Sequence, residues 1–341
     1  MTATIQDRVE QLLEIGLKNF WYPICPSDFI KEKPVSLHRL GYKLALWRDH
    51  AGTLHVLEDR CPHRGAPLSL GVILGDRLSC PYHGVEVRCD GMTVRVPGSP
   101  GCKLEGSKKT RFFHVKEAAG AVFLYNGAND VETPPPLALP EQLTDDAHYS
   151  SFLCYAEWKG DYRYVLDNLL DPMHGTYLHK QSHSMAEGDS SALFDIRPSD
   201  VGFFVEKQSQ RNVNFDWSEW GDTGIHWVRL EIPYPKNGGP GGNFIIISGY
   251  VPVSPGVCAV FFWRCRKLEP GWQRDTWRFL YRNRLEARHW AVLEQDRVLL
   301  ESMEADANEH ENLYQHDVGL VRLRRLLKQA ALDQVERQPA V

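Results

Sequence analysis

The stretch CPHRGAPLSLGVILGDRLSCPYHG, residues 61–84, carries two mixed pairs of side chains that bind metals. Cys61 and His63 are two positions apart at its start, and Cys80 and His83 are three apart at its end. In an extended segment alternate side chains point the same way, so the first pair can face one metal ion. A proline and a glycine around the second pair favour a turn that brings both side chains inward. Two loops of this kind at neighbouring hairpin tips predict a pocket with four ligands.

The two pairs admit two arrangements, because each contributes one thiolate and one imidazole. Four ligands could surround one tetrahedral zinc ion, or two thiolates could hold one iron of a binuclear cluster while two imidazoles hold the other. Zinc fingers usually pair Cys with Cys and His with His, and neither pairing occurs here. The pattern C-x-H, sixteen residues, C-x-x-H resembles the signature of the Rieske [2Fe-2S] centre. This resemblance implies that Cys61, His63, Cys80 and His83 bind the cluster.

The resemblance also separates two branches of Rieske proteins. Respiratory and photosynthetic members carry an extra, disulfide-bonded cysteine in each loop, at the positions that here are Ala66 and Tyr82. They are also held to a membrane by an apolar helix, and no apolar run in this sequence approaches the roughly 18 residues that such a helix needs. The chain therefore resembles the oxygenase branch.

The order of segments predicts two domains. Residues 35–128 alternate apolar and polar side chains in short stretches separated by Asp-Gly, Pro-Gly and Asn-Gly turns, which indicates an all-β module. A proline-rich, acidic stretch at 131–148 is typical of a linker, and long strand-like segments followed by helix formers come after it. We expect an α+β chain: an all-β Rieske domain with an N-terminal helix at 1–130, the linker at 131–148, and an antiparallel sheet with helices at 149–341.

Composition excludes several classes of protein. The chain has 341 residues and a formal net charge of -5, which gives no reason to expect nucleic acid or an anionic membrane as a partner. The first residues are amphipathic, with Ile5, Val9, Leu12 and Leu13 at helical spacing, and contain no signal-peptide core. We therefore expect a cytoplasmic protein in which the eight cysteines form no disulfide framework.

A second motif, N-x-x-D-x-x-H-x₄-H, is formed by Asn168, Asp171, His174 and His179. On a helix the two histidines, five apart, are displaced by about 140° around the axis. Both can reach one metal only if the helix ends or is distorted between them, and Gly175 lies at that point. Two ordinary histidines near a helix end are the alternative for such a pair.

The second motif, at its place after a Rieske domain, resembles the mononuclear iron motif of the Rieske non-haem iron oxygenases. The resemblance implies that His174 and His179 bind Fe(II) and that Asp171 is the aspartate that links this iron to a Rieske histidine of the adjacent subunit. Asn168 would support the same site. Two histidines and one carboxylate leave iron positions open for oxygen and substrate.

The third iron ligand is an aspartate far downstream in this family, early in a C-terminal helix, and Asp317 is at the matching place. Asp317 can equally be a simple N-cap, since Asp is among the best residues there. Asp306 and Asp296 are the reserve candidates for the carboxylate ligand.

The resemblance covers nearly the whole chain and implies the terminal oxygenase component of a multicomponent system. Such a protein takes electrons from a reductase, directly or through a ferredoxin, and uses O₂ to hydroxylate or O-demethylate an aromatic substrate. It would work as a homotrimer. No arginine can be assigned from the sequence to a substrate carboxylate.

Three alternatives stay open at this stage. Cis-dihydroxylation of an aromatic ring is possible with the same two metal sites, although monooxygenation is favoured. A Rieske electron-transfer protein would need only the first site, and a zinc-stabilised binding module would use the first four ligands structurally.

Overall fold

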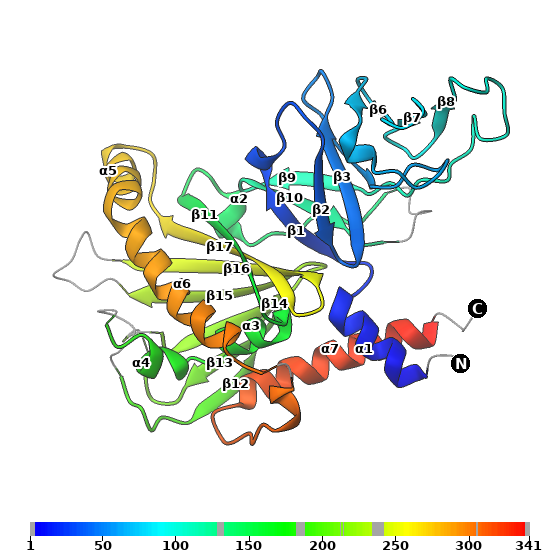
Figure 1. Cartoon of the computed structure of the whole chain (residues 1–341). Helices are drawn as coiled ribbons and strands as arrows, with labels where there is room; N and C mark the ends of the chain where they lie inside the picture. Colours follow the sequence, from blue (N-terminus) through cyan, green and yellow to red (C-terminus); the bar gives the residue numbers. More distant parts are fainter. Residues whose placement is uncertain are drawn as a thin grey trace. The chain divides into compact units, whose positions relative to one another are not determined.

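The computed structural model describes residues 4–127, 133–181, 188–211, 213, 215–233, 242–304 and 306–337. The chain divides into two compact units, one formed by Ile15–Leu137 and the other by Met1–Glu14 together with Ala138–Val341. The first unit is built from strands and the second from one large sheet with helices, as Figure 1 shows. The predicted α+β class is therefore confirmed. Within the described ranges, no helix has both the length and the apolar character required to cross a bilayer.

The first unit contains three small antiparallel sheets whose strands are short, as the turn-rich sequence predicts. Their orders are β1-β10-β9, β2-β3-β4 and β5-β6-β7-β8. The strands are β1 (Trp21–Pro26), β2 (Val35–Arg39), β3 (Tyr42–Arg48), β4 (Leu54–Glu58), β5 (Val72–Ile73), β6 (Arg77–Ser79), β7 (Glu86–Arg88), β8 (Thr93–Arg95), β9 (Val115–Ala118) and β10 (Ala121–Tyr125).

A single apolar cluster supports both metal-binding loops of the first unit. Cys61 and Cys80 are buried in the same cluster as Trp47 of β3 and Val87 of β7. The indole N–H of Trp47 donates to the carbonyl of Gly75, 3.2 Å away, so this large side chain leaves no unpaired donor in the core. The loops therefore rest on packed side chains, although their tips are open to solvent.

The second unit is organised around one seven-stranded antiparallel sheet in the order β11-β17-β16-β15-β14-β13-β12. Its strands are β11 (Tyr149–Trp158), β12 (Phe194–Pro198), β13 (Gly202–Lys207), β14 (Trp217–Asp222), β15 (His226–Pro233), β16 (Asn243–Ser254) and β17 (Val257–Lys267). The short helix α2 (Glu141–Thr144) precedes the sheet, inside the stretch predicted to be a linker; residues 131 and 132 of that stretch lie outside the described part.

One long helical segment covers a face of this sheet (Figure 1). It consists of α5 (Trp272–Leu280), a π-helical turn at Tyr281–Leu285, and α6 (Glu286–Glu301). The N–H of Glu286 donates to the carbonyl of Tyr281, which is the i to i+5 pattern of a π turn. The extra residue in this turn changes which side chains of α6 face the sheet.

The C-terminal helix α7 (Val318–Arg337) packs through a narrow apolar stripe. Leu320, Leu323 and Leu327 are buried, whereas Leu326 is exposed. Ala331 continues the buried side. The spacing of these buried residues is that of one helix face.

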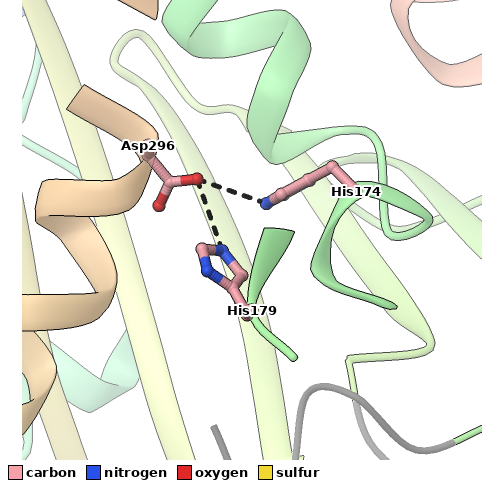
Figure 2. A group of neighbouring side chains, drawn as sticks. All are labelled: His174, His179 and Asp296. Atoms are coloured by element: carbon pink, nitrogen blue, oxygen red, sulfur yellow. Dashed lines mark ion pairs between the residues drawn. The ribbon is translucent and has the colours of Figure 1, made fainter. Parts of the chain in front are cut away.

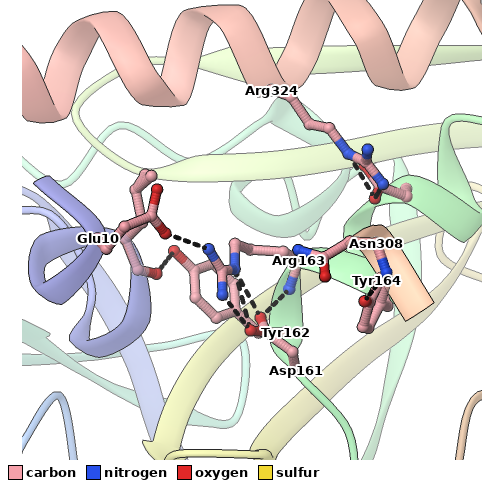
Figure 3. Close-up of polar contacts among 9 residues, drawn as sticks. Glu10, Asp161, Tyr162, Arg163, Tyr164, Asn308 and Arg324 are labelled. Carbon is pink, nitrogen blue, oxygen red and sulfur yellow. Dashed lines mark hydrogen bonds and ion pairs between the residues drawn. The ribbon is translucent and has the colours of Figure 1, made fainter. Parts of the chain in front are cut away.

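The N-terminal helix α1 (Ile5–Ile15) differs from the expected division, because residues up to Glu14 belong to the second unit. Figure 3 shows the polar contacts that attach it to α3 (Tyr162–Leu169). The buried hydroxyl of Tyr162 donates to the carbonyl of Leu13, and Arg163 forms an ion pair with Glu10 at 3.2 Å. At the other end, Arg8 donates to the carbonyl of Val335 of α7 at 3.3 Å.

Candidate metal centres

The two loops of the first unit share one backbone pattern. The N–H of Cys61 donates to the carbonyl of Ala66, and the N–H of Cys80 donates to that of Val85, both at 2.8 Å. In each loop the glycine four residues after the cysteine has a positive φ, 74° and 69°, and returns its N–H to the carbonyl of the cysteine at 2.9 and 3.0 Å. Only glycine adopts this backbone conformation readily, so the sequence repeat Cys-Pro…Gly encodes two equal turns.

The four side chains on these turns are sorted by type. Cys61 and Cys80 are each 3% exposed, and burial, with the neighbouring Cys80 thiol, raises the pKa of Cys61 to about 11. The exposed rings of His63 and His83 lie together, with centroids 4.7 Å apart. Two thiols on one side and two imidazoles on the other fit a binuclear cluster with a thiolate-held and an imidazole-held iron.

In the second unit the helix that carries the other motif breaks at Pro172. Helix α3 ends at Leu169, and α4 (His174–Leu178) is a new short turn. The predicted distortion is therefore present, but it precedes His174 instead of lying at Gly175, because proline disfavours helical geometry in the residue before it. His174 is the first residue of α4 and His179 is its C-cap residue, so one short helical turn separates the two histidines.

Each histidine is oriented by a hydrogen bond at Nδ1. The ring of His174 donates to the carbonyl of Asp171 at 2.5 Å, and that of His179 donates to the side-chain oxygen of Gln295 at 2.8 Å. With the proton on Nδ1, the lone pair of each neutral imidazole is on Nε2. Both Nε2 atoms face the same carboxylate, as Figure 2 shows.

That carboxylate belongs to Asp296 of α6. Its Oδ1 lies 3.6 Å from Nε2 of His174 and 3.3 Å from Nε2 of His179, and the side-chain amide of Asn168 donates to the same oxygen at 3.5 Å. Among the described residues, this is the only group of three or more His, Cys, Asp or Glu with all ligand atoms within 4.8 Å of one another. Two imidazole lone pairs and a carboxylate oxygen are all electron-pair donors, so a cation between them relieves their mutual repulsion. The donor set of two histidines and one carboxylate fits Fe(II).

Asp317, the first choice for the carboxylate ligand, is not part of this group. Its side chain accepts a hydrogen bond from the N–H of Tyr314 at 2.7 Å, and its carbonyl accepts the first helical bond of α7 from Val321. Its main chain therefore begins the helix, at the N-cap position, whereas its side chain is bonded to the preceding loop. Asp306 is exposed and pairs with His310 at 3.4 Å. Of the three candidate carboxylates, the one that the structure brings to the two histidines is Asp296, the second reserve candidate.

Asp171 is placed to support His174 through its main chain. Its carbonyl fixes the ring of His174, and its carboxylate accepts from the N–H of Met173 at 2.8 Å. Burial raises the pKa of this carboxyl, which the nearby His174 opposes. A buried aspartate beside a metal-binding histidine is typical of residues that orient metal ligands.

An apolar pocket opens at the histidines and Asp296. Its empty volume, including the solvent at its mouth, is about 710 Å³. Alternate residues of β15, β16 and β17 form its floor and α6 forms its roof. The lining includes Phe215, Leu230, Ile232, Phe244, Ile246, Phe262, Arg264, His289, Val292 and Leu293.

Sequence reasoning missed the contribution of α6 to this site. His289, Val292, Leu293 and Asp296 are spaced by three, one and three residues, which is the pattern of one helix face. A histidine and an aspartate on an otherwise apolar stripe are a signal that could have ranked Asp296 first. Gln295, which orients His179, left no such signal.

Two family profiles match the chain. The Rieske [2Fe-2S] domain matches residues 20–108, and the vanillate O-demethylase oxygenase C-terminal domain matches residues 158–333. The vanillate O-demethylase oxygenase subunit of Pseudomonas sp. (strain HR199 / DSM 7063) is 32% identical over 52% of this chain and 49% of its own length. The oxygenase component of dicamba O-demethylase from Stenotrophomonas maltophilia is 29% identical over 63% of this chain and 65% of its own length. These matches span about half to just under two thirds of the relatives.

The fold is shared with solved structures over the full chain. The oxygenase in a reduced complex with ferredoxin, from carbazole 1,9a-dioxygenase, superposes with a TM-score of 0.76 at 21% identity and covers 100% of this chain and 99% of that one. At this level of identity the likeness concerns the fold.

Proposed function

Because the chain belongs to the family of the vanillate O-demethylase oxygenase C-terminal domain and carries a Rieske [2Fe-2S] domain, we propose that it is the terminal oxygenase component of a multicomponent Rieske oxygenase. The observation that carries this proposal is the meeting of His174, His179 and Asp296 at the mouth of an apolar pocket. A protein that only transfers electrons has no use for a second metal site beside such a pocket.

The proposed metal ligands follow from the two geometries. Cys61 and Cys80 hold one iron of the cluster, and His63 and His83 hold the other. The second group, His174, His179 and Asp296, holds the mononuclear iron. When bound, these groups supply single electrons and activate O₂ beside the substrate.

The residues around the mononuclear site orient its ligands. The carbonyl of Asp171 and the amide oxygen of Gln295 fix the two imidazoles, each with Nε2 facing inward. The amide of Asn168 holds one oxygen of Asp296. The apolar floor and roof of the pocket exclude bulk water from a bound aromatic ring.

Monooxygenation, as hydroxylation or O-demethylation of an aromatic compound, is the reaction we favour. The two curated relatives described above are both named as oxygenase components of O-demethylases. Cis-dihydroxylation is the second candidate, favoured by the full-length likeness to the oxygenase of carbazole 1,9a-dioxygenase.

The proposed partners are a reductase, directly or through a ferredoxin, and two further copies of this chain. The ferredoxin complex of the carbazole oxygenase supports the first, and the resemblance of Asp171 to the family's bridging aspartate supports a homotrimer. The eight free cysteines suit a reducing compartment, so we propose the cytoplasm as the location.

The test is metal and acid-labile sulfide content of anaerobically purified protein, followed by turnover of methoxylated aromatic compounds with a reductase and O₂. We expect iron in excess of labile sulfide, a Rieske-type electron paramagnetic resonance signal after reduction, and release of formaldehyde. Equal iron and sulfide without turnover would favour an electron-transfer protein. Zinc without sulfide would overturn both readings.

A further inference from the structure

The pocket beside the candidate mononuclear site contains a buried cation without a partner. Arg264 lies in the middle of β17, opposite Ile246 of β16 and Phe152 of β11, and its residue is 2% exposed. Its Nε and one terminal nitrogen, Nη2, are buried and make no hydrogen bond. No described carboxylate forms an ion pair with it.

A guanidinium in this position is costly to bury. Transfer of a charge out of water is unfavourable unless the charge is paired and its donors are satisfied. The rings of Phe262 and Phe244, with centroids 5.6 and 6.0 Å from its central carbon, favour a cation but accept no N–H bond in the plane of the guanidinium. The two unsatisfied N–H groups therefore point to an acceptor that binds from the pocket.

The alternation of the strands explains why the guanidinium faces the pocket. Phe262 and Arg264 lie on one face of β17, and Ile246 and Phe244 occupy the same face of β16. Every one of these residues lines the pocket that also contains Asp296. Among the described residues of this lining, Arg264 is the only lysine or arginine.

The carboxylate already in the pocket, that of Asp296, forms no ion pair with Arg264. Asp296 is directed at the two histidine Nε2 atoms and at the amide of Asn168. His289, the third histidine of the lining, is no anion, and its Nδ1 also lacks a partner. The pocket thus offers unpaired polar groups on an apolar floor, and the candidate iron ligands line the same pocket.

We propose that Arg264 binds the carboxylate of an aromatic acid, so that the substrate of the proposed oxygenase is a carboxylated aromatic ring. The inference deepens the proposed function and rests on it for the identity of the pocket. A carboxylate is the group that matches adjacent guanidinium N–H donors with two parallel bonds. The aromatic ring then packs between the apolar strand residues and α6.

The experiment compares an acid with its uncharged analogue. Isothermal calorimetry measures binding of 4-methoxybenzoate and of 4-methoxybenzamide, which has the same shape and no charge, to the anaerobic protein with its metals. We expect the wild-type protein to bind the acid at least about 30-fold more tightly than the amide, the factor that corresponds to loss of a buried charge pair.

Three variants locate the effect. Arg264→Met and Arg264→Gln should abolish the preference for the acid, and Arg264→Lys should retain part of it, because lysine keeps the charge without the planar pair of donors. Arg288→Met, which removes an exposed arginine from α6, the helix that forms the roof of the pocket, is the matched control and should keep the full preference.

A second readout does not depend on binding by a variant. Removal of an unpaired buried charge should raise the melting temperature of ligand-free Arg264→Met by several degrees. In the wild-type protein, 4-methoxybenzoate should raise the melting temperature and the amide should not.

Two results would overturn the inference: the absence of any preference for the acid in the wild-type protein, or a preference that Arg264→Met retains. Failure of the oxygenase proposal is a separate outcome. It would appear as binding of the acid that depends on Arg264 without any substrate-dependent uptake of O₂. Turnover of uncharged aromatics with no preference for acids would support the oxygenase proposal and contradict the role of Arg264.

Discussion

At the scale of single residues, Asp296 is the residue on which the proposed mononuclear iron site depends most. It is 6% exposed and meets two histidine nitrogens and one amide donor, whereas Asp317 lies just before α7 and accepts a hydrogen bond from Tyr314 in its own loop. A buried carboxylate that faces two imidazole lone pairs is stable only with a cation or a proton among them.

Asp296→Ala is therefore predicted to remove the mononuclear iron and all oxygenase activity. Iron content should fall while acid-labile sulfide and the Rieske-type signal stay unchanged, because the cluster lies in the other unit. Asp317→Ala is the matched control, and its iron content should equal that of the wild type. Loss of iron in the control with retention in Asp296→Ala would reverse the assignment of the ligand.

The motif around His174 and His179 could be identified from the sequence because both histidines lie in one short segment. The third ligand could not be identified in this way. Six strands, β12 to β17, lie between His179 and the long helical segment that carries Asp296, so no spacing rule connects the two residues. Only the packing of α6 on the sheet brings it near.

His289 predicts a loss of stability in acid. Burial, with the positive charges of Arg264 and Arg288, lowers its pKa to about 3 in the folded protein, against about 6.5 when unfolded. The unfolded chain therefore binds a proton that the folded one does not, and the free energy of unfolding falls as pH drops from 6.5 towards 3. We expect a loss of ~3 kcal/mol from this group between pH 7 and pH 4.

The measurement is urea denaturation of the ligand-free protein at both pH values. In His289→Gln the loss of stability on acidification should be smaller by this amount. The exposed His310 provides the control, and His310→Gln should follow the wild type. An equal response in His289→Gln and the wild type would show that His289 ionises normally.

At the scale of elements, one backbone feature and one close contact set the positions of the helices around the site. The π turn before α6 rotates its face towards the sheet, and the close approach of Gly319 lets α7 reach the end of α3. A Cβ on Gly319 would lie 2.5 Å from the carbonyl oxygen of Leu170 and 2.8 Å from Cγ2 of Val205. Leu170 immediately precedes Asp171, so this contact supports the segment that orients His174.

Gly319→Ala is predicted to lower the free energy of unfolding by about 1–3 kcal/mol, because the helix must move away from a main-chain oxygen. Gly160→Ala is the control, since its Cβ would meet nothing closer than the carbonyl oxygen of Leu300 at 3.9 Å. That substitution should change stability by less than about 0.5 kcal/mol. Equal denaturation midpoints for the two variants would show that α7 does not press on α3.

The elements differ in how far the sequence predicts them. The short strands of the first unit are marked by turns that glycine and asparagine specify, and the long strands of the second by β-branched and aromatic runs. The π turn at Tyr281–Leu285 has no such marker. The helix break before His174 is marked by Pro172, but the sequence alone also offered Gly175 as the point of distortion.

At the scale of the whole molecule, the proposed trimer makes activity a property of neighbouring chains. A variant without a complete cluster, His83→Ala, and one without the mononuclear site, His174→Ala, should each be inactive alone. Co-expressed with different tags and purified on both, they should regain activity if electrons cross between subunits. Every trimer that is purified on both tags contains both variants, so about one third of its interfaces join an intact cluster to an intact iron site.

The control is native mass spectrometry of the doubly purified sample, which establishes that both variants share one assembly. Mixed assemblies without oxygen uptake would mean that electrons travel within one chain. Activity of either variant alone would remove its metal site from the mechanism.

The sequence predicted two domains with the N-terminal helix in the first, whereas residues up to Glu14 group with the second unit. An amphipathic helix shows which of its faces is buried and does not show against what. The contacts of Glu10, Leu13 and Arg8 with α3 and α7 are all long-range, so they depend on the finished fold.

The position of α1 has a consequence for the order in which a ribosome makes the protein. The first unit, Ile15–Leu137, is continuous and can fold as soon as it has emerged. Helix α1 is made before it, yet its partner Val335 lies in α7, 327 residues after Arg8. Helix α1 therefore stays without its final contacts until α7 has been made, and during that time the nascent chain exposes an amphipathic segment to chaperones.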